Sequence, residues 1–269
     1  MRTIKQILVI LLVLLLAGQI ATNIYLGSSD KQDPPKIYCE QKTLDVSATD
    51  GSSVLLTGIT ANDPQDGDLT SKVIVGSVSK LISENTAKVT YLVFDSDDNM
   101  ASCSRYIRYT DYRRPRLYVK SALHFSSTDG VNILESLGAT DVLDGDISSQ
   151  VRVSTLSATE NSEIFNISIQ VTNSVGDTSR QELPVLIQPT DHLRPVIKLT
   201  NYLIYLKAGT KFYPEDYISS ATVIGQNIPM DAISIDNPAD TETPGTYRVF
   251  YTYDNNGHLG TAIMTVVVQ

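Results

Sequence analysis

The sequence of 269 residues contains no tryptophan, two cysteines, three histidines and fewer basic than acidic side chains. Its 21 Lys and Arg against 30 Asp and Glu give a formal net charge of −9. Nucleic-acid binding depends mainly on neutralising phosphates with Lys and Arg, so this balance argues against a nucleic-acid partner. The absence of tryptophan also removes the commonest side chain for stacking against sugars, although tyrosine can replace it.

Motifs that carry catalysis are also missing. No His-Glu-x-x-His, Gly-x-Ser-x-Gly, Gly-x-Gly-x-x-Gly or P-loop pattern occurs. The histidines are dispersed along the chain: His124 lies in a strand-like stretch, His192 in a linker and His258 at a hairpin tip. We therefore expect no enzymatic activity and no catalytic cofactor.

The one long apolar run lies at the N-terminus. Residues 7–17 are all apolar, Arg2 and Lys5 precede them, and a polar stretch begins at Ser28. Two interpretations remain open: an uncleaved single-pass anchor over residues 1–27, or a signal peptide cleaved after Ala21. Cleavage is the weaker alternative because Gln19 stands where a small residue is required. Both predict that the chain after a linker at 28–34 lies outside the cytoplasm, with the anchor placing it on the cell membrane.

A repeat of about eighty residues organises the remainder. Similar segments begin at Pro35, Pro115 and Pro195, which are 80 residues apart. The stretch from Asp63 to Thr70 also resembles the stretch from Asp141 to Ser148, at an offset of 78. Repeats of this length predict three similar domains, at residues 35–111, 112–191 and 192–269.

Within each repeat the hydrophobic pattern has a period of two. Stretches rich in β-branched and aromatic residues predict strands at 88–93, 164–172, 246–253 and 264–268. Turn residues at 95–99, 175–177 and 255–257 predict hairpins. The sequence therefore predicts an all-β fold of three tandem antiparallel β-sandwiches after an N-terminal hydrophobic helix, with one short helical turn at 213–217. We expect Tyr247, Tyr251 and Tyr253 to pack in the third core rather than bind a ligand.

Three motifs of the first repeat resemble a bacterial immunoglobulin-like domain family. They are Pro35-Lys36-Ile37, the Asp-Gly-Asp stretch from Asp63 to Thr70, and the stretch from Val89 to Asn99. The second repeat has Asn173 where the family has Asp, and the third lacks Asp-Gly-Asp. Members of this family occur in tandem on secreted and surface proteins of Gram-positive bacteria, and in a pesticidal crystal protein. The resemblance implies immunoglobulin-like sandwiches that act as spacers or adhesive modules.

The repeat also allows the cysteines to be interpreted. Cys39 aligns with Val119 and Leu199, while Cys103 aligns with Leu183, so both cysteines occupy positions that are apolar in the other repeats. Buried free thiols are common in cytosolic proteins, but an exported domain favours a disulfide. We therefore predict a Cys39–Cys103 bridge in the first domain.

Two acidic turns are candidate calcium sites. Each places three carboxylates around one glycine, and carboxylate oxygens are ligands that calcium prefers. Against calcium, each turn offers only three side chains and lacks a closing bidentate Glu; the alternative is a tight turn in which the carboxylates accept backbone N–H groups. The candidate ligands are Asp63, Asp66, Asp68, Asp141, Asp144 and Asp146.

These features predict a non-enzymatic protein of the bacterial cell surface, anchored in the membrane by its N-terminal segment. Its three immunoglobulin-like domains would act as a spacer or interaction module outside the cell, with an unidentified protein or glycan as partner. The alternative is a secreted adhesin that binds carbohydrate or protein through the loops of the third domain.

Overall fold

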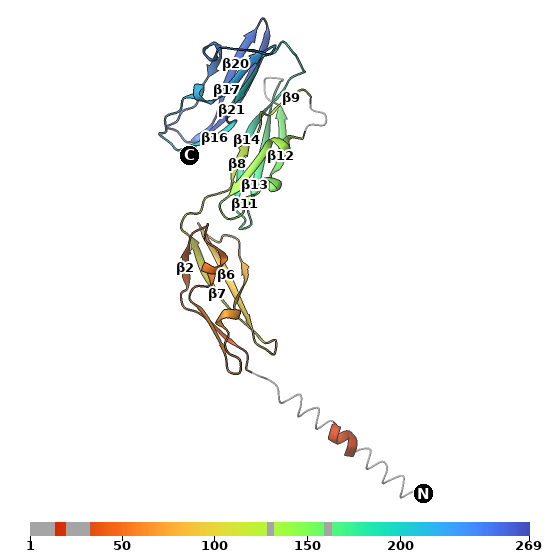
Figure 1. The fold of residues 1–269 in the computed structure, drawn as a ribbon, viewed down its shortest axis with the longest axis vertical. Coiled ribbons are helices and arrows are strands. Elements are labelled where there is room, and N and C mark those ends of the chain that lie inside the picture. The colour runs from red at the N-terminus through yellow and green to blue at the C-terminus, as the bar shows by residue number, and fades with distance from the viewer. Residues whose placement is uncertain (1–13, 20–32, 128–131, 159–162) are drawn as a thin grey trace, which may run out of the picture. The chain divides into compact units, whose positions relative to one another are not determined.

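The computed structural model describes residues 14–19, 33–127, 132–158 and 163–269, and the fold is all-β (Figure 1). Its strands form six sheets in three pairs, each pair containing a three-stranded and a four-stranded sheet. Each pair comes from one of the predicted repeats, which confirms the prediction of three tandem β-sandwiches. Strands that pair with their sequence neighbours across short turns account for most of this topology.

The predicted membrane anchor falls mostly outside the described residues. Of residues 1–27, positions 14–19 are described, and they form a helix. Among the described residues, no helix has both the length and the apolar character that a membrane crossing requires.

The first sandwich contains seven strands. Alternate residues of its longest strands face the core: Ala87, Val89, Tyr91 and Val93 are fully buried, and the residues between them are not. This is the period of two that the sequence predicts for a strand with one buried face. One sheet has the order β1 (Lys36–Cys39), β3 (Ile59–Asp63), β4 (Gly67–Asp68), and the other β2 (Thr43–Val46), β7 (Met100–Tyr109), β6 (Thr86–Phe94), β5 (Ile74–Val78).

The second sandwich repeats this arrangement. Its core includes Ile167, Ile169 and Val171, which alternate along β13 at the positions that the sequence predicts. One sheet has the order β11 (Gly145–Asp146), β10 (Leu137–Asp141), β8 (Arg116–Val119), and the other β12 (Arg152–Ala158), β13 (Ile164–Thr172), β14 (Thr178–Ile187), β9 (His124–Phe125).

The third sandwich has the longest hairpin, formed by β20 and β21. Tyr251 is fully buried and its hydroxyl donates to Pro214 O at 2.9 Å, while Tyr247 and Tyr253 pack against the same core. The predicted helical turn is present as a 3-10 helix at Pro214–Tyr217. One sheet has the order β15 (Val196–Leu199), β17 (Ile218–Val223), β18 (Gln226–Asn227), and the other β16 (Leu203–Leu206), β21 (His258–Val268), β20 (Gly245–Asn255), β19 (Ser234–Asp236).

In the second and third sandwiches a short strand pairs in parallel with a long one, which the sequence analysis did not predict. In the second sandwich β9 pairs parallel with β14, and in the third β16 pairs parallel with β21. Both β9 and β16 are short strands that follow β8 and β15 respectively and cross to the opposite sheet. Such short segments lack enough alternating residues to be recognised by period.

The described chain divides into two compact units. One comprises the N-terminal segment to Val46 together with residues 51–79 and 88–108; the other comprises residues 47–50, 80–87 and 109–269. The second and third sandwiches therefore belong to one compact unit. Each of the three sandwiches nevertheless has its own pair of sheets.

The second and third sandwiches pack directly on each other. Leu203 of β16 is only 6% exposed and belongs to the core cluster of the second sandwich, which Tyr205 and Val267 also contact. The Tyr205 hydroxyl donates to Leu117 O at 3.1 Å, and the Arg116 guanidinium carbon lies 5.1 Å from the centre of the Tyr205 ring. Shared apolar packing of this kind restricts bending between the two domains.

Candidate functional site

The two Asp-Gly-Asp turns use their first carboxylate to hold the turn itself. Asp63 Oδ1 accepts the N–H groups of Gln65 and Asp66, both at 2.8 Å. Asp141 Oδ1 accepts the N–H groups of the equivalent residues at 2.9 and 3.1 Å. The glycines of the two turns, Gly67 and Gly145, have φ values of 74° and 71°, a conformation that glycine adopts without steric cost. This is the geometry of an Asx turn.

The second carboxylate of each turn ties it to the next hairpin. Asp66 accepts the backbone N–H of Ser96 at 2.7 Å and its hydroxyl at 2.8 Å. Asp144 accepts the same two groups of Ser174, both at 2.6 Å. The equivalence of the two pairs shows that the acidic motif is a structural brace repeated in both domains.

The third carboxylate accepts the N–H of the 3-10 turn that follows. Asp68 Oδ1 accepts Thr70 N–H at 2.8 Å, and Asp146 Oδ1 accepts Ser148 N–H at 2.9 Å. Hydrogen bonds from Thr70 lower the pKa of Asp68, and those from Ser148 lower the pKa of Asp146. Both carboxylates are therefore held in their ionised form.

The geometry of these turns favours the structural alternative over calcium. Most of the candidate carboxylate oxygens accept hydrogen bonds from backbone N–H groups and hydroxyls; Asp63 Oδ2 is buried and has no hydrogen-bond partner among the described residues. Across the described ranges, no group of three or more His, Cys, Asp or Glu side chains is placed to hold a metal ion. Calcium binding by Asp63, Asp66, Asp68, Asp141, Asp144 and Asp146 stays a prediction.

Cys39 and Cys103 form a disulfide, as the sequence predicts. Cys39 ends β1 and Cys103 lies in β7, so the bridge joins the two sheets of the first sandwich across 64 residues of sequence. Both cysteines are half-buried, although their apolar equivalents in the other repeats led us to expect the core. A disulfide of this kind is typical of proteins that fold outside the reducing cytoplasm.

The first core also contains a buried arginine that the sequence analysis missed. Arg105 is 2% exposed; its Nε donates to the Tyr91 hydroxyl at 3.0 Å and its Nη2 to Leu55 O at 2.8 Å. The Tyr91 hydroxyl donates to the same carbonyl at 2.6 Å. Alternation along β7 would have marked Arg105 as inward-facing, because Ile107 and Tyr109 are on the same face.

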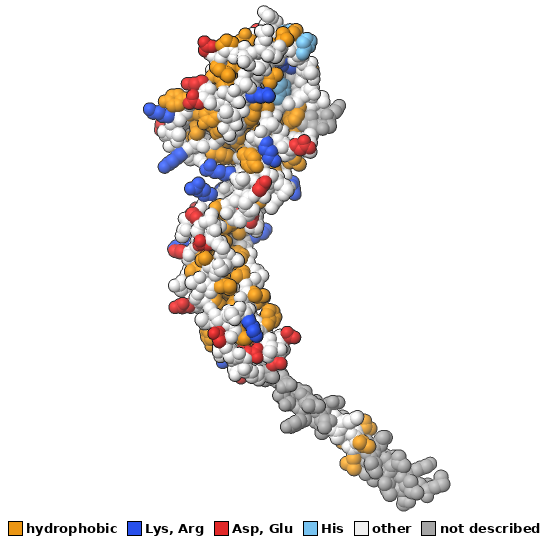
Figure 2. Space-filling model, viewed as in Figure 1, with side chains coloured by type: hydrophobic (Ala, Val, Ile, Leu, Met, Phe, Trp, Pro, Cys, Tyr) orange, Lys and Arg blue, Asp and Glu red, His pale blue; other side chains and the backbone are white. Residues whose placement is uncertain are grey.

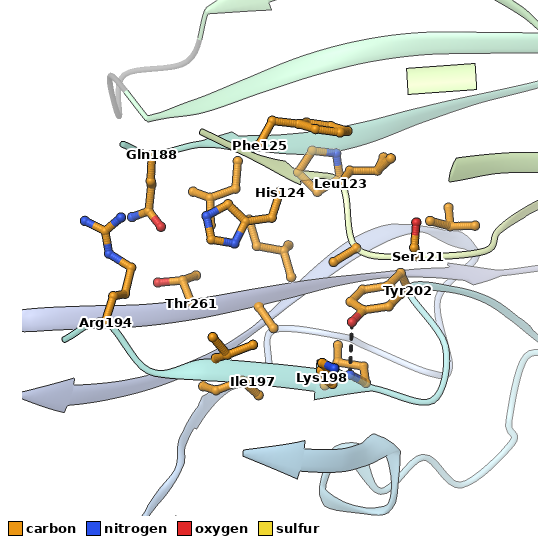
Figure 3. A pocket seen from close by; sticks show the side chains of 18 of the residues that line it. Ser121, Leu123, His124, Phe125, Gln188, Arg194, Ile197, Lys198, Tyr202 and Thr261 are labelled. Carbon is orange, nitrogen blue, oxygen red and sulfur yellow. Dashed lines mark hydrogen bonds between the residues drawn. The ribbon is translucent and has the colours of Figure 1, made fainter. Parts of the chain in front are cut away.

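A pocket of about 670 Å³ lies between the second and third sandwiches (Figure 3). Its walls come from the segment Val119–Ser126, the end of β14, the linker from Gln188 to Arg194, β15 and the middle of β21. Gln188 and Arg194 stand at one end, Ser121 and Tyr202 at the other, and His124 between them. A concave site of this size with mixed apolar and polar walls is typical of small-molecule sites.

Two buried polar atoms in the pocket lining have no hydrogen-bond partner in the part of the chain that the structure describes. They are Oε1 of Gln188, a residue that is 4% exposed, and Nε of Arg194. The other ends of both side chains are fixed: Gln188 Nε2 donates to Glu163 Oε2 at 2.6 Å, and Arg194 Nη1 donates to Pro189 O at 2.9 Å. Buried polar groups are normally paired, so this exception marks the site.

The charges around the pocket are partly balanced. Asp191 Oδ2 lies 2.6 Å from His258 Nδ1, and its Oδ1 accepts the N–H of Leu193 at 2.9 Å. The hydrogen bond from His258 and the nearby Arg194 charge lower the pKa of Asp191. Burial lowers the pKa of His124, and the charge of Arg194 adds to this effect, so the imidazole is neutral at pH 7.

Sequence reasoning could not find this pocket. Its lining residues come from two domains, and although the repeated segments that begin at Pro115 and Pro195 contribute Val119 and Pro195–Leu199, the repeat does not show that they meet. His192, which lies in the linker, was noted but does not line the pocket, whereas His124 does.

Comparison with known proteins gives weak similarities. No protein-family model matches the chain. A stretch of 165 residues, 56% of the chain, is 27% identical to the "Uncharacterized 81.3 kDa protein" of Acholeplasma phage L2. The chain spans 22% of the length of that protein.

Solved structures with tandem domains are also similar to parts of the chain. The CBM51-2 and INT domains of Clostridium perfringens ZmpB, in complex with GlcNAc, are 23% identical, with a TM-score of 0.24, over 52% of this chain and 29% of theirs. Drosophila N-cadherin EC1-4 is 13% identical, with a TM-score of 0.23, over 88% of this chain and 75% of its own. These similarities assign no ligand, partner or activity; the pairs of sheets themselves make the chain a tandem array of three immunoglobulin- or cadherin-like β-sandwiches.

Proposed function

We propose that this chain is a non-enzymatic spacer and interaction module outside the cytoplasm, held at a bacterial cell surface by its N-terminal apolar segment. We further propose that its domains belong to the bacterial immunoglobulin-like family that their motifs resemble. The observation that carries the spacer role is the packing of Leu203 into the core of the neighbouring sandwich. Domains joined in this way keep a fixed relative orientation, which a spacer requires.

Two further observations support the proposal. The inter-sheet disulfide is typical of an oxidising compartment. In addition, the acidic motifs that are the main polar feature of the sequence brace turns and hairpins in the described domains, as Asp66 and Asp144 do. Figure 2 shows acidic, basic and hydrophobic side chains interspersed on the visible surface, as on other solvated proteins.

Fractionation of cells that express the full chain with a C-terminal tag tests this proposal. We expect the tag in the membrane fraction, and we expect protease added to intact cells to remove it. A mature protein found entirely in the medium and beginning near Thr22 would contradict the anchor and favour secretion. A tag that is protected from protease in intact cells would contradict the extracytoplasmic location.

The alternative function, a secreted adhesin, is favoured by the exposed apolar side chains on the connecting segments of the third sandwich. Tyr213, Ile224 and Met230 are 53%, 67% and 48% exposed. Ile224 also has a φ of 48°, in the left-handed region that a β-branched residue rarely adopts. An exposed apolar residue kept at such a position is more easily explained by a contact with a partner than by stability.

The adhesin alternative predicts that a glycan array or immobilised surface proteins capture residues 28–269, and that Ile224→Asn abolishes capture. Asn tolerates the left-handed conformation, so this variant keeps the turn while removing the apolar contact. Leu259→Asn serves as a matched control because Leu259 is also exposed, at 48%, but lies in β21 and does not line the pocket between the second and third sandwiches. Equal capture of the native protein and Ile224→Asn would contradict the role of this loop.

A further inference from the structure

We propose that the pocket between the second and third sandwiches binds a carbohydrate of one or two sugar rings. The pocket volume of about 670 Å³ lies within the range of small-ligand sites. The inference goes beyond the proposed function, because the spacer role holds whether or not the pocket is occupied. It also concerns a different part of the molecule from the loops of the adhesin alternative.

The end of the pocket at Gln188 and Arg194 specifies a hydroxyl group. Gln188 Oε1 needs a hydrogen-bond donor and Arg194 Nε needs an acceptor, and the described residues supply neither. Because the opposite ends of both side chains are hydrogen-bonded to Glu163 and Pro189, neither can turn away without losing a bond. A hydroxyl both donates and accepts, so a single hydroxyl, or two on adjacent carbons, satisfies both atoms. Leaving them unsatisfied is costly, which gives a polar ligand its advantage over an apolar one.

The walls of the pocket specify a ligand with apolar faces between its hydroxyls. Leu123 and Ile197 are buried, and the rings of Phe125 and Tyr202 also line the pocket. The Tyr202 hydroxyl already accepts the N–H of Leu199 at 3.2 Å, so its ring contributes mainly apolar surface. Sugar rings combine apolar C–H faces with hydroxyls at their edges, and they match a site with apolar walls and a few fixed polar groups.

The charges at the end of the pocket near Arg194 favour a neutral group there over an anionic one. Lys120 and Lys198 also line the pocket, but Arg194 is the cation at this end, and the Asp191 carboxylate lies close enough for their charges to interact. An anion placed at Arg194 would therefore meet the negative charge of Asp191. A hydroxyl needs no counter-charge and avoids this repulsion.

Access to Gln188 passes the His124 side chain. Figure 3 shows the His124 imidazole between the Gln188 amide and the rest of the pocket. His124 is partly exposed at the surface and belongs to β9, a strand of two residues. A change of its rotamer uncovers the Gln188 amide without moving the sheets, on the nanosecond timescale of exposed side chains.

Saturation-transfer NMR on the full chain tests the proposal with glucose, galactose, N-acetylglucosamine, lactose and maltose as probes. We expect saturation transfer to at least one of these sugars. Two variants should weaken it: Gln188→Leu, which removes the acceptor, and Ser219→Trp, which fills the mouth of the pocket. Ser219 lines the pocket, is exposed, and sits where the register of β15 and β17 shifts, so a larger side chain leaves the core intact.

Gln181→Leu is the matched control, because Gln181 lies on β14 and its Nε2 donates to Thr246 Oγ1 outside this pocket. We expect Gln188→Leu to weaken binding about tenfold, the factor expected for one hydrogen bond, and Gln181→Leu to leave it unchanged. No saturation transfer to any of the five sugars would overturn the proposal, with water as the occupant of the pocket. Transfer that survives Ser219→Trp would also overturn it, because the sugar would then bind elsewhere.

Discussion

Replacing Leu203 by alanine should destabilise the second sandwich as well as the third, although Leu203 belongs to the third. The side chain is 6% exposed and packs into the core cluster of the second domain. Removing the equivalent of three methylene groups costs about 2.4 kcal/mol in transfer free energy, and the cavity left behind raises this to roughly 3 kcal/mol. For a cooperative unit of this size, the loss corresponds to a fall in Tm of about 6–12 °C.

The absence of tryptophan makes this prediction easy to measure. Phe165→Trp places a fluorescent reporter against the second core, and Phe212→Trp places one against the third. We expect Leu203→Ala to lower the urea midpoints of both reporters. Leu199→Ala deletes the same atoms from a site in the third core alone. It should therefore lower the urea midpoint of the Phe165→Trp reporter, in the second core, by less than Leu203→Ala does.

A Leu203→Ala variant that lowers the urea midpoint of the Phe212→Trp reporter in the third core, and leaves that of the Phe165→Trp reporter in the second core unchanged, would contradict this prediction. The two sandwiches would then unfold independently, and the shared packing would add little to their stability. The rigid spacer would lose its main structural support, although the fold of each domain would stand.

Four further predictions concern single features. Replacing Cys39 and Cys103 by alanine should lower the free energy of unfolding of the first sandwich by roughly 4 kcal/mol, measured by urea denaturation, because the bridge closes 64 residues; an unchanged midpoint would contradict this. Ile224→Asn should stabilise the third sandwich by about 1 kcal/mol, seen as a higher Tm, through relief of left-handed strain. Asp66→Ala should lower the Tm of the first sandwich through loss of two hydrogen bonds, whereas millimolar calcium should leave the native Tm unchanged; a rise with calcium would favour the cation site. Asp191→Asn should lower the Tm at pH 7. The difference in Tm between Asp191→Asn and the native protein should shrink below pH 3.8, the ordinary pKa of Asp, because folding lowers the pKa of Asp191 and the stability that this gives is lost as the carboxylate is protonated.

The strands with alternating residues could be predicted because their pattern is local. The predicted strand at 164–172 coincides with β13, and Tyr251 lies in the core as its alternation with neighbouring residues indicated. The disulfide could be predicted because the repeat aligns each cysteine with an apolar residue that faces the other sheet. In these cases one period or one alignment carried the necessary information.

Features that depend on how domains pack could not be predicted. Nothing in the sequence of β16 distinguishes Leu203, which packs into the neighbouring domain, from Ile204, which packs into its own. Gln188 and Arg194 are ordinary polar residues of a linker, and only the folded pair of sandwiches buries their unpartnered atoms. The acidic turns could be found from the sequence, but their pattern fits both a calcium site and a structural turn. The hydrogen bond from Ser96 to Asp66 favours the structural turn.

Thiol labelling of the full chain tests whether the protein works outside the cytoplasm. Cells that express the chain are lysed in denaturant with a maleimide reagent that adds measurable mass to each free thiol. Because Cys39 and Cys103 are the only cysteines, we expect no labelling without reductant and two labels after reduction. Two labels without reductant would show that the bridge does not form in cells, and would contradict the extracytoplasmic location.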